Sequence, residues 1–312
     1  MSGLIGLDWG TSSLRAMLMD GGGNVLEVRS RPWGVRQLPD GGFAGALQTI
    51  TASWPDVPRI ASGMVGSRNG WREVPYVDLP AGQGDLAQAL DRGADGNSLA
   101  IVSGLRNPRG PDVMRGEETQ IIGLIAEHRD AHNATVVLPG THSKWVTVRD
   151  GLIVDFRTMM TGELYGLLRQ HSILCAGVAN DAGPFDSQAF IDGVRSARDS
   201  GAAGAFSRLF AARALMLDGA LSANAVPDYL SGLLIGEEFR AMRADAGTAG
   251  HAPLWLIGDA ALCARYRLAA GEFEASLAPP VDDSAAAGLW CLAKAGGLVA
   301  RSNSMTSTRA NP

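Results

Sequence analysis

The chain opens with LIGLDWGTSS at residues 4–13, an apolar run that ends in an acid, a glycine and three hydroxyl side chains. A second apolar run follows at 14–19, the sequence GGGN at 21–24 predicts a turn, and a third apolar run covers 25–29. Short apolar runs separated by glycine-bearing turns are typical of antiparallel strands. We therefore expect a three-stranded meander with a polar first turn at the start of the chain.

The same order of elements returns further along the chain. An apolar run at 135–138 leads into the polar sequence PGTHS at 139–143, and two more apolar runs cover 144–148 and 152–156. Between the two meanders, apolar residues recur at helical spacing in the segment 114–128. The sequence thus predicts an α/β fold in which two similar units each combine a sheet with helices.

The composition excludes several classes of protein. Of the 312 residues, 46% are hydrophobic and 19% are charged, which is typical of a folded chain. The 27 basic and 32 acidic residues form no basic block, so nucleic acid is not an expected partner. No apolar run reaches the roughly 18 residues of a membrane span, and no signal peptide is recognisable. The three cysteines lie far apart in apolar surroundings, and we expect free thiols in a cytoplasmic protein.

The first polar turn carries groups that suit a phosphate and a metal ion. Gly10 lets backbone N–H groups approach an anion, and Thr11 and Ser12 can donate hydrogen bonds to phosphate oxygens. Asp8 ends the preceding run, where its carboxylate can hold Mg²⁺ directly or through water. The alternative is an ordinary hairpin in which Asp8 only favours the turn.

Two further sequences offer similar groups. Gly140 and Thr141 occupy the matching turn of the second meander, and Lys144 follows with a positive charge. Gly258 and Asp259 lie between a predicted strand and a predicted helix, an arrangement that places a helix N-terminus beside a ligand. Each alone can also be a routine loop, with Lys144 solvated. Because two polar turns occupy matching places, we expect both to grip the phosphates of one nucleotide.

The segment 114–120 supplies two carboxylates and an arginine. Arg115 can bind a substrate carboxylate through two hydrogen bonds. Glu117 or Glu118 can accept the proton of an attacking hydroxyl or help to hold Mg²⁺. Neighbours on a helix point about 100° apart, so only one of them is expected to face a site. The alternative is a purely stabilising role, because acids favour the first turn of a helix.

Other candidate substrate-binding residues lie in loops. A glycine-spaced loop carries the polar side chains Ser67, Arg68 and Asn69, which suit hydrogen bonding to hydroxyls and to a carboxylate. Alternatively, it is an exposed polar loop. Arg106 joins Arg68 and Arg115 as a candidate to bind a substrate carboxylate. There is no P-loop motif and no Gly-x-Gly-x-x-Gly after a strand, so neither a P-loop enzyme nor a dinucleotide dehydrogenase is expected.

Several of these sequences together resemble known families. The run DWGTSSLRA at 8–16 resembles the phosphate-1 hairpin of the actin-like ATPase superfamily, which includes actin, Hsp70, hexokinase and many sugar kinases. More specific runs, of which RGEETQ and MTGEL are the most distinctive, resemble the 2-dehydro-3-deoxygalactonokinase family. These runs lie at 61–71, 113–120, 139–145, 155–164 and 230–236. The resemblance extends from about residue 4 to about residue 300.

The resemblance implies an architecture. Two actin-like (ribonuclease H-like) domains of mixed sheet plus helices would flank an interdomain cleft. The expected domains are 1–120, with the phosphate-1 hairpin and the substrate, and 121–300, with the phosphate-2 hairpin and the nucleoside site. The last helix, 285–298, is expected to pack back on the first domain, and 301–312 to form a frayed tail.

The resemblance also implies a reaction. ATP would phosphorylate the 6-hydroxyl of 2-dehydro-3-deoxy-D-galactonate in galactonate catabolism, giving the 6-phosphate and ADP, with ATP and Mg²⁺ as cofactors. Asp8 would serve Mg²⁺, and Gly258 and Asp259 would lie near the nucleoside. The phosphate-binding residues would be Thr11, Ser12, Gly140 and Thr141. The expected partners are the sugar acid and ATP, and self-association into a homo-oligomer is left open.

Two alternatives stay open at this point. The chain could be a kinase for another sugar or sugar acid, because the residues alone do not select one stereoisomer. It could also be a non-catalytic regulator that binds a nucleotide or a sugar on the same fold, since fold does not fix function. ADP formation that depends on a sugar acid separates the enzyme from the regulator.

Overall fold

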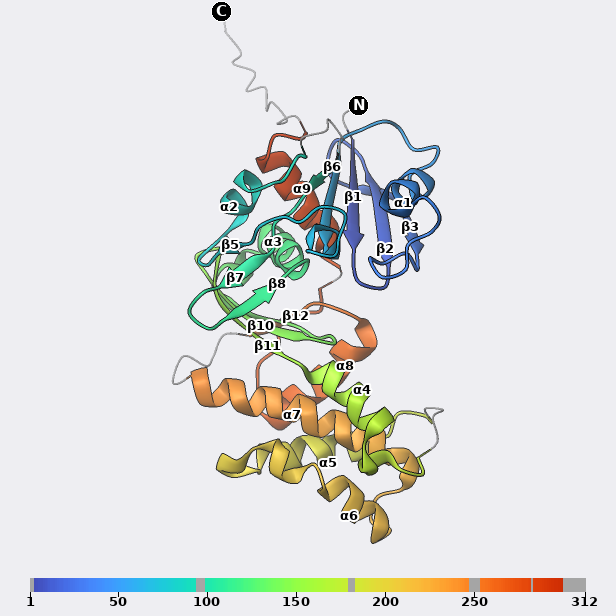
Figure 1. Ribbon diagram of the computed structural model, residues 1–312. Helices are drawn as coiled ribbons and strands as arrows, with labels where there is room; N and C mark the ends of the chain where they lie inside the picture. Colours follow the sequence, from blue (N-terminus) through green and yellow to red (C-terminus); the bar gives the residue numbers. More distant parts are fainter. Residues whose placement is uncertain (1–2, 94–98, 179–182, 247–252, 282, 300–312) are drawn as a thin grey trace, which may run out of the picture. The chain divides into compact units, whose positions relative to one another are not determined.

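The computed structural model describes residues 3–93, 99–178, 183–246, 253–281 and 283–299. The chain divides into unit 1, residues 1–129 with 283–312, and unit 2, residues 130–282. The sequence placed the division at 120, which falls inside α3 (Glu117–Glu127). This helix belongs to unit 1 because it packs along α9 (Ala285–Ala295) of the same unit (Figure 1). The tail at 301–312 lies outside the described residues.

Unit 1 is built on a sheet with the strand order β3-β2-β1-β4-β6. Its strands are β1 (Leu4–Trp9), β2 (Leu14–Met19), β3 (Val25–Arg31), β4 (Arg59–Gly63) and β6 (Leu99–Ile101). The antiparallel pairing of β1, β2 and β3 confirms the predicted meander, and β4 and β6 continue the sheet in parallel with β1. β1 lies inside the sheet, and Ile5 and Leu7 have no exposed surface.

The other elements of unit 1 include a small sheet that the sequence did not predict. The helices are α1 (Gly42–Ile50), α2 (Gln83–Gln88), α3 and α9, with the 3-10 turn η1 (Met64–Gly66). The small sheet has the order β5-β7-β8, with β5 (Val77–Asp78), β7 (Leu105–Asn107) and β8 (Asp112–Met114). The helix expected from 114 begins instead at Glu117, because β8 takes up Met114 and Gly116 has a φ of 112°.

Unit 2 repeats the pattern with the strand order β11-β10-β9-β12. Its strands are β9 (Ala134–Leu138), β10 (Ser143–Arg149), β11 (Leu152–Met159) and β12 (Leu254–Leu256). The first three form the second predicted meander, and β12 pairs in parallel with β9. The helices are α4 (Thr161–His171), α5 (Ser187–Arg198), α6 (Ala211–Leu217), α7 (Val226–Ala246) and α8 (Ala260–Glu272). Short 3-10 segments are η2 (Arg129–Asn133), which spans the division, η3 (Ile173–Cys175), η4 (Gly201–Ala203), η5 (Ala205–Arg208) and η6 (Ala223–Ala225).

A pair of helices in each unit packs closely at glycines. In unit 1, α3 packs along α9, and a Cβ at Gly288 would lie 1.9 Å from the carbonyl oxygen of Thr119. In unit 2, α5 packs along α7, and a Cβ at Gly232 would lie 1.9 Å from the carbonyl oxygen of Phe190 (Figure 1). Helix backbones approach this closely only where one residue has no side chain.

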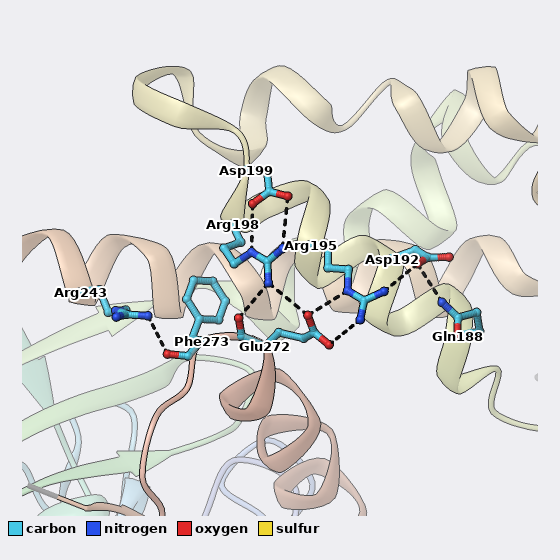
Figure 2. Close-up of polar contacts among 8 residues, drawn as sticks. All are labelled: Gln188, Asp192, Arg195, Arg198, Asp199, Arg243, Glu272 and Phe273. Atoms are coloured by element: carbon cyan, nitrogen blue, oxygen red, sulfur yellow. Dashed lines mark hydrogen bonds and ion pairs between the residues drawn. The ribbon is translucent and has the colours of Figure 1, made fainter. Parts of the chain in front are cut away.

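A cluster of charged residues joins α5 to the end of α8 in unit 2 (Figure 2). Arg195 donates to the carboxylate of Glu272 at 2.8 and 3.0 Å. Arg198 donates to the same carboxylate at 3.2 Å and pairs with Asp199. The Glu272 side chain is 16% exposed, so these pairs are better shielded from solvent than the pair of Arg198 with Asp199. In the described part of the chain, no helix has the length and apolarity needed to cross a membrane.

Candidate functional site

In unit 1 the ends of β1 and β4 and the start of α3 meet at glycines. β1 pairs with β4 so that Trp9 lies opposite Gly63. A Cβ at Gly63, whose φ is 94°, would lie 2.8 Å from the carbonyl oxygen of Trp9. A Cβ at Gly116 would in turn lie 3.2 Å from the Cα of Gly63. These close approaches place the C-terminal end of β1, with Asp8, beside the helix start that carries Glu117.

The loop at 33–36 packs against the backbone of the turn at the end of β1. Gly10 N–H donates to the carbonyl oxygen of Ser13 at 2.9 Å and closes the turn. A Cβ at Gly34 would lie 2.1 Å from the carbonyl oxygen of Thr11, so the loop touches the turn backbone directly. Thr11 is half-buried and Ser12 is exposed. The turn is therefore fixed, while the Ser12 hydroxyl remains accessible.

Asp8 lies in a charged cluster that the sequence did not indicate. Its Oδ2 accepts a hydrogen bond from Arg15 Nη2 at 3.1 Å, and Arg15 also pairs with Asp283. Burial raises the pKa of Asp8 above its usual range, and the charges of Asp283 and Glu117 add to the rise, whereas Arg15 opposes it. The Asp8 side chain keeps 31% of its surface exposed. The carboxylate is thus accessible, and Glu117 is close enough to influence its ionisation.

The two adjacent carboxylates of α3 have different surroundings. Glu118 has no exposed surface, and its carboxylate accepts hydrogen bonds from Gly116 N–H at 2.7 and 2.9 Å. Burial raises the pKa of Glu118 to about 7, and the charge of Glu117 adds to the rise. Glu117 is half-buried and accepts a hydrogen bond from Arg115 N–H at 3.0 Å. Glu118 therefore holds the start of the helix, and Glu117 is the carboxylate that reaches the surface near Asp8.

Arg115 has donors that no described residue satisfies. Its Nη2 donates to the carbonyl oxygen of Val74 at 2.7 Å, and its guanidinium lies 4.3 Å from the ring centre of Tyr76. Arg115 Nε and Nη1 and Ser67 Oγ are buried without a hydrogen-bond partner among the described residues. A Cβ at Gly66 would lie 2.9 Å from Arg115 Nη1, so this nitrogen is beside the loop that carries Ser67. Unsatisfied buried donors cost free energy, and a ligand acceptor would remove that cost.

Of the remaining substrate-binding candidates, two share the loop of Ser67 and the third is paired with a carboxylate. Arg68 and Asn69 are exposed in the loop that Gly70 N–H closes onto Ser67 at 2.8 Å. Arg106 donates from Nε and Nη2 to the two carboxylate oxygens of Asp78 at 2.6 and 3.0 Å. The geometry therefore brings Arg68 and Asn69 into the same loop as Ser67, whereas the donor fork of Arg106 is occupied by Asp78.

In unit 2 the turn after β9 lies against the starts of two helices. A Cβ at Gly162, at the start of α4, would lie 2.6 Å from the carbonyl oxygen of Gly140. A Cβ at Gly258, just before α8, would lie 3.4 Å from the carbonyl oxygen of Pro139. Thr141 is exposed. The sequences around Gly140 and Gly258 are therefore neighbours, and helix N-termini of this kind favour an anion.

Two charged candidates in unit 2 have protein partners. Asp259 Oδ1 accepts a hydrogen bond from Leu262 N–H at 3.0 Å and caps α8. Lys144 is 4% exposed, and its Nζ donates to the carbonyl oxygen of His142 at 3.1 Å. The alternative that Lys144 is solvated is therefore wrong, because the side chain folds back beneath the turn.

Glu238 of α7 is a buried carboxylate that the sequence analysis missed. It is 2% exposed and accepts hydrogen bonds from Trp145 Nε1 at 2.7 Å and from Tyr266 OH at 2.8 Å. Burial raises the pKa of Glu238, although these donors oppose the rise. No motif surrounds it in the sequence, and its position on an apolar helical stripe was the available signal.

Comparisons with known proteins identify relatives of this chain. The chain is 38% identical to the 2-dehydro-3-deoxygalactonokinase of Escherichia coli (strain K12) over 269 residues, which covers 85% of this chain and 88% of that protein. A crystal structure from Sinorhizobium meliloti, assigned as a 2-dehydro-3-deoxygalactonokinase, has a TM-score of 0.85 at 36% identity and covers 94% of this chain and 98% of that one.

A more distant likeness bears on the fold alone. A ligand-bound xylulose kinase from Lactobacillus acidophilus has a TM-score of 0.51 at 12% identity, with 96% of this chain and 90% of that one covered. This likeness confirms the predicted actin-like sugar-kinase fold. The protein-family model described as 2-keto-3-deoxy-galactonokinase matches residues 8–292, a span that includes both polar turns and the starts of α3, α4 and α8. The chain therefore belongs to the 2-keto-3-deoxy-galactonokinase family.

Proposed function

We propose that this chain transfers the γ-phosphoryl group of ATP to the 6-hydroxyl of 2-dehydro-3-deoxy-D-galactonate, giving the 6-phosphate and ADP in galactonate catabolism. The observation that carries the proposal is the family match over residues 8–292, which spans both polar turns. Phosphoryl transfer depends mainly on positioning and on charge neutralisation. The proposed roles follow from where each polar group lies.

Asp8 is the residue that would hold Mg²⁺. Carboxylate oxygens are ligands that Mg²⁺ prefers, and the ion usually keeps several waters and binds one or two carboxylates together with substrate phosphates. This mode fits the described residues, among which no group of three or more His, Cys, Asp or Glu side chains is arranged to hold a metal. When bound, the ion neutralises phosphate charge. The Arg15 ion pair orients the carboxylate of Asp8.

The two turns would bind the phosphates of ATP. Thr11 and Ser12 lie in the turn after β1, and Gly140 and Thr141 lie in the turn after β9. In unit 2, the start of α8 with Gly258 and Asp259 would lie near the nucleoside. Support comes from the exposed residues Ser12 and Thr141 and from the helix starts beside the second turn.

Glu117 would accept the proton of the attacking hydroxyl. It is half-buried, whereas Glu118 has no exposed surface and is engaged with the backbone of Gly116. A general base must come within hydrogen-bond reach of the proton that it removes. The difference in exposure therefore favours Glu117 over its neighbour.

The carboxylate of the sugar acid would bind at Arg115. Arg115 Nε and Nη1 and Ser67 Oγ are buried donors without a described partner. Arginine matches a carboxylate with parallel hydrogen bonds, and such charge-assisted bonds are stronger than neutral ones. Arg68 and Asn69, exposed in the same loop as Ser67, would reach the hydroxyls of the sugar.

A substrate panel tests the proposal. The purified chain, ATP and Mg²⁺ are combined with several 2-keto-3-deoxy sugar acids, and ADP release is followed by a coupled assay. ADP and a 6-phosphate should form with 2-dehydro-3-deoxy-D-galactonate. ADP formation only with another acid would assign a different kinase, and nucleotide binding without ADP formation on any acid would assign a regulator.

We also place the reaction in the cytoplasm. Cys175, Cys263 and Cys291 are free thiols, as is usual for proteins in a reducing compartment.

A further inference from the structure

A buried carboxylate lies behind the second polar turn, outside the groups used above. Glu238 projects from α7, and its two oxygens accept hydrogen bonds from Trp145 of β10 and from Tyr266 of α8. The side chains of Thr161 and Ser143 also form hydrogen bonds with it. A buried carboxylate is costly unless several donors satisfy it, and here donors from β10, α4 and α8 converge on it.

A chain of hydrogen bonds leads from Glu238 toward the second turn. Tyr266 has one hydroxyl proton, which it donates to Glu238 at 2.8 Å. Ser143 Oγ lies 2.9 Å from the Tyr266 hydroxyl. The Ser143 hydroxyl can donate to the buried side or to the carbonyl oxygen of Gly140, which lies 3.4 Å from Ser143 Oγ. Ser143 therefore links Tyr266 to the backbone of the second turn.

Ser143 contacts the backbone of the second turn through Gly140. Gly140 N–H donates to Ser143 Oγ at 3.4 Å, at the long end of the usual range. The start of α4, with Thr161, touches the same turn, because a Cβ at Gly162 would lie 2.6 Å from the carbonyl oxygen of Gly140. The carboxylate thus orders the strand that leaves the turn and the helix that lies beside it.

We propose that Glu238 is a positioning residue for nucleotide binding, which acts through Tyr266 and Ser143 to hold the turn at 139–142 in its anion-binding form. This inference rests on the proposed function, since it takes the turn as a phosphate site. Glu238 touches no substrate. The ligand class that it affects is the nucleoside triphosphate or diphosphate, and the sugar acid is unaffected.

A purely structural role predicts a different outcome. A buried carboxylate with four partners contributes to stability wherever it lies, and its loss then lowers the thermal midpoint without a selective change in ligand affinity. A positioning role instead changes the KM for ATP but not the KM for the sugar acid, because the turn binds only the nucleotide. The measurement must therefore compare the two substrates in the same variants.

Glu238→Gln and Tyr266→Phe are the informative variants. Glu238→Gln keeps the size but places an NH₂ group opposite a donor, and Tyr266→Phe removes one link and leaves the carboxylate in place. We expect each to raise the KM for ATP and the Kd for ADP about tenfold, the effect of about 1.4 kcal/mol, while the KM for the sugar acid changes less than about twofold. The double variant should bind ATP and ADP no more weakly than the weaker-binding of the two single variants. The reason is that both substitutions interrupt the same chain of hydrogen bonds.

Glu272→Gln is the matched control, since it alters a carboxylate of unit 2 that pairs with Arg195 and Arg198 on α5. It should leave the affinities for both substrates unchanged. The proposal is overturned if Glu238→Gln and Tyr266→Phe lower the thermal midpoint without raising the Kd for ADP, or if both KM values rise in parallel. If Glu238→Gln fails to fold, Tyr266→Phe decides by the same measurements. If the wild-type chain binds ADP but phosphorylates none of the acids, only the proposed function is overturned. The Kd for ADP of each variant, measured by titration calorimetry, then still tests the role of Glu238.

Discussion

Gly232→Ala tests whether close helix packing determines the stability of unit 2. The new Cβ would lie 1.9 Å from the carbonyl oxygen of Phe190 and 2.8 Å from its carbonyl carbon. Real Cβ atoms essentially never come within 3.0 Å of another atom, so the backbones of α5 and α7 must separate locally by at least 1.1 Å, the difference between 3.0 and 1.9 Å. Because the obstacle is backbone, no side-chain rotation relieves it.

The expected cost follows from two opposing effects. Overpacking of a well-packed contact costs about 1–3 kcal/mol or more, and Val194 and Leu233, which have no exposed surface, lie at this contact. Alanine gains about 0.5–1 kcal/mol over glycine inside a helix. The 1.9 Å approach to a backbone oxygen favours the upper end of the overpacking range, so we expect the free energy of unfolding of unit 2 to fall by about 2 kcal/mol after the propensity gain is subtracted.

Urea unfolding followed by circular dichroism measures this change. The matched control is Gly166→Ala in α4, where a Cβ would meet no atom within 4 Å. That variant should gain up to about 1 kcal/mol from helix propensity alone. If Gly232→Ala is as stable as the wild-type chain while Gly166→Ala behaves as expected, the helices are not in the close contact on which the reasoning depends.

Three further predictions concern unit 1. Asp8→Ala should still bind the sugar acid in calorimetry but lose most of its turnover, and unchanged turnover would refute the role of Asp8. Glu117→Gln should lower kcat about 100-fold or more with the fold intact, and full activity would exclude Glu117 as the base. Arg115→Ala should raise the KM for the sugar acid at least tenfold with the KM for ATP unchanged, and a rise for both would contradict selective carboxylate binding.

A fifth prediction concerns Glu118. Burial raises the pKa of Glu118 from 4.5 to about 7, so the folded state binds a proton that the unfolded state releases. The associated stability is complete below about pH 4.5 and is lost as the pH rises toward 7. As the pH rises from about 5 to 7, the urea midpoint of Glu118→Gln should therefore fall less than that of the wild-type chain. The same pH dependence in both proteins would contradict the raised pKa of Glu118.

The sequence predicts a strand correctly where a single apolar run covers the whole strand. Both meanders consist of apolar runs of several residues between glycine-bearing turns, and their strands appear at the expected places. The strands β5, β7 and β8 are two or three residues long, too short for alternation to be visible. Because β8 includes Met114, the helix start was predicted too early, and the positive φ of Gly116 could not be read from the letter G.

The grouping of site residues depends on contacts between distant parts of the chain. Asp8 and Glu117 come together because Gly63 and Gly116 allow three backbones to touch, and a glycine in a sequence does not reveal what approaches it. The Asp283 carboxylate, which pairs with Arg15, had no motif to mark it.

For Glu238, in contrast to Asp8 and Asp283, the sequence contains a pattern that indicates its surroundings. Ile235, Glu238, Phe239 and Met242 follow the spacing of one helical stripe, so helix formation alone turns this carboxylate toward an apolar interior. A carboxylate in such a position requires buried donors, and their existence could have been inferred from the stripe. Their identity could not, since Trp145 lies 93 residues away and Tyr266 lies 28 residues away along the chain. The helical register thus determines that a buried polar network exists, and only the tertiary fold determines that it leads to Gly140 and the second turn.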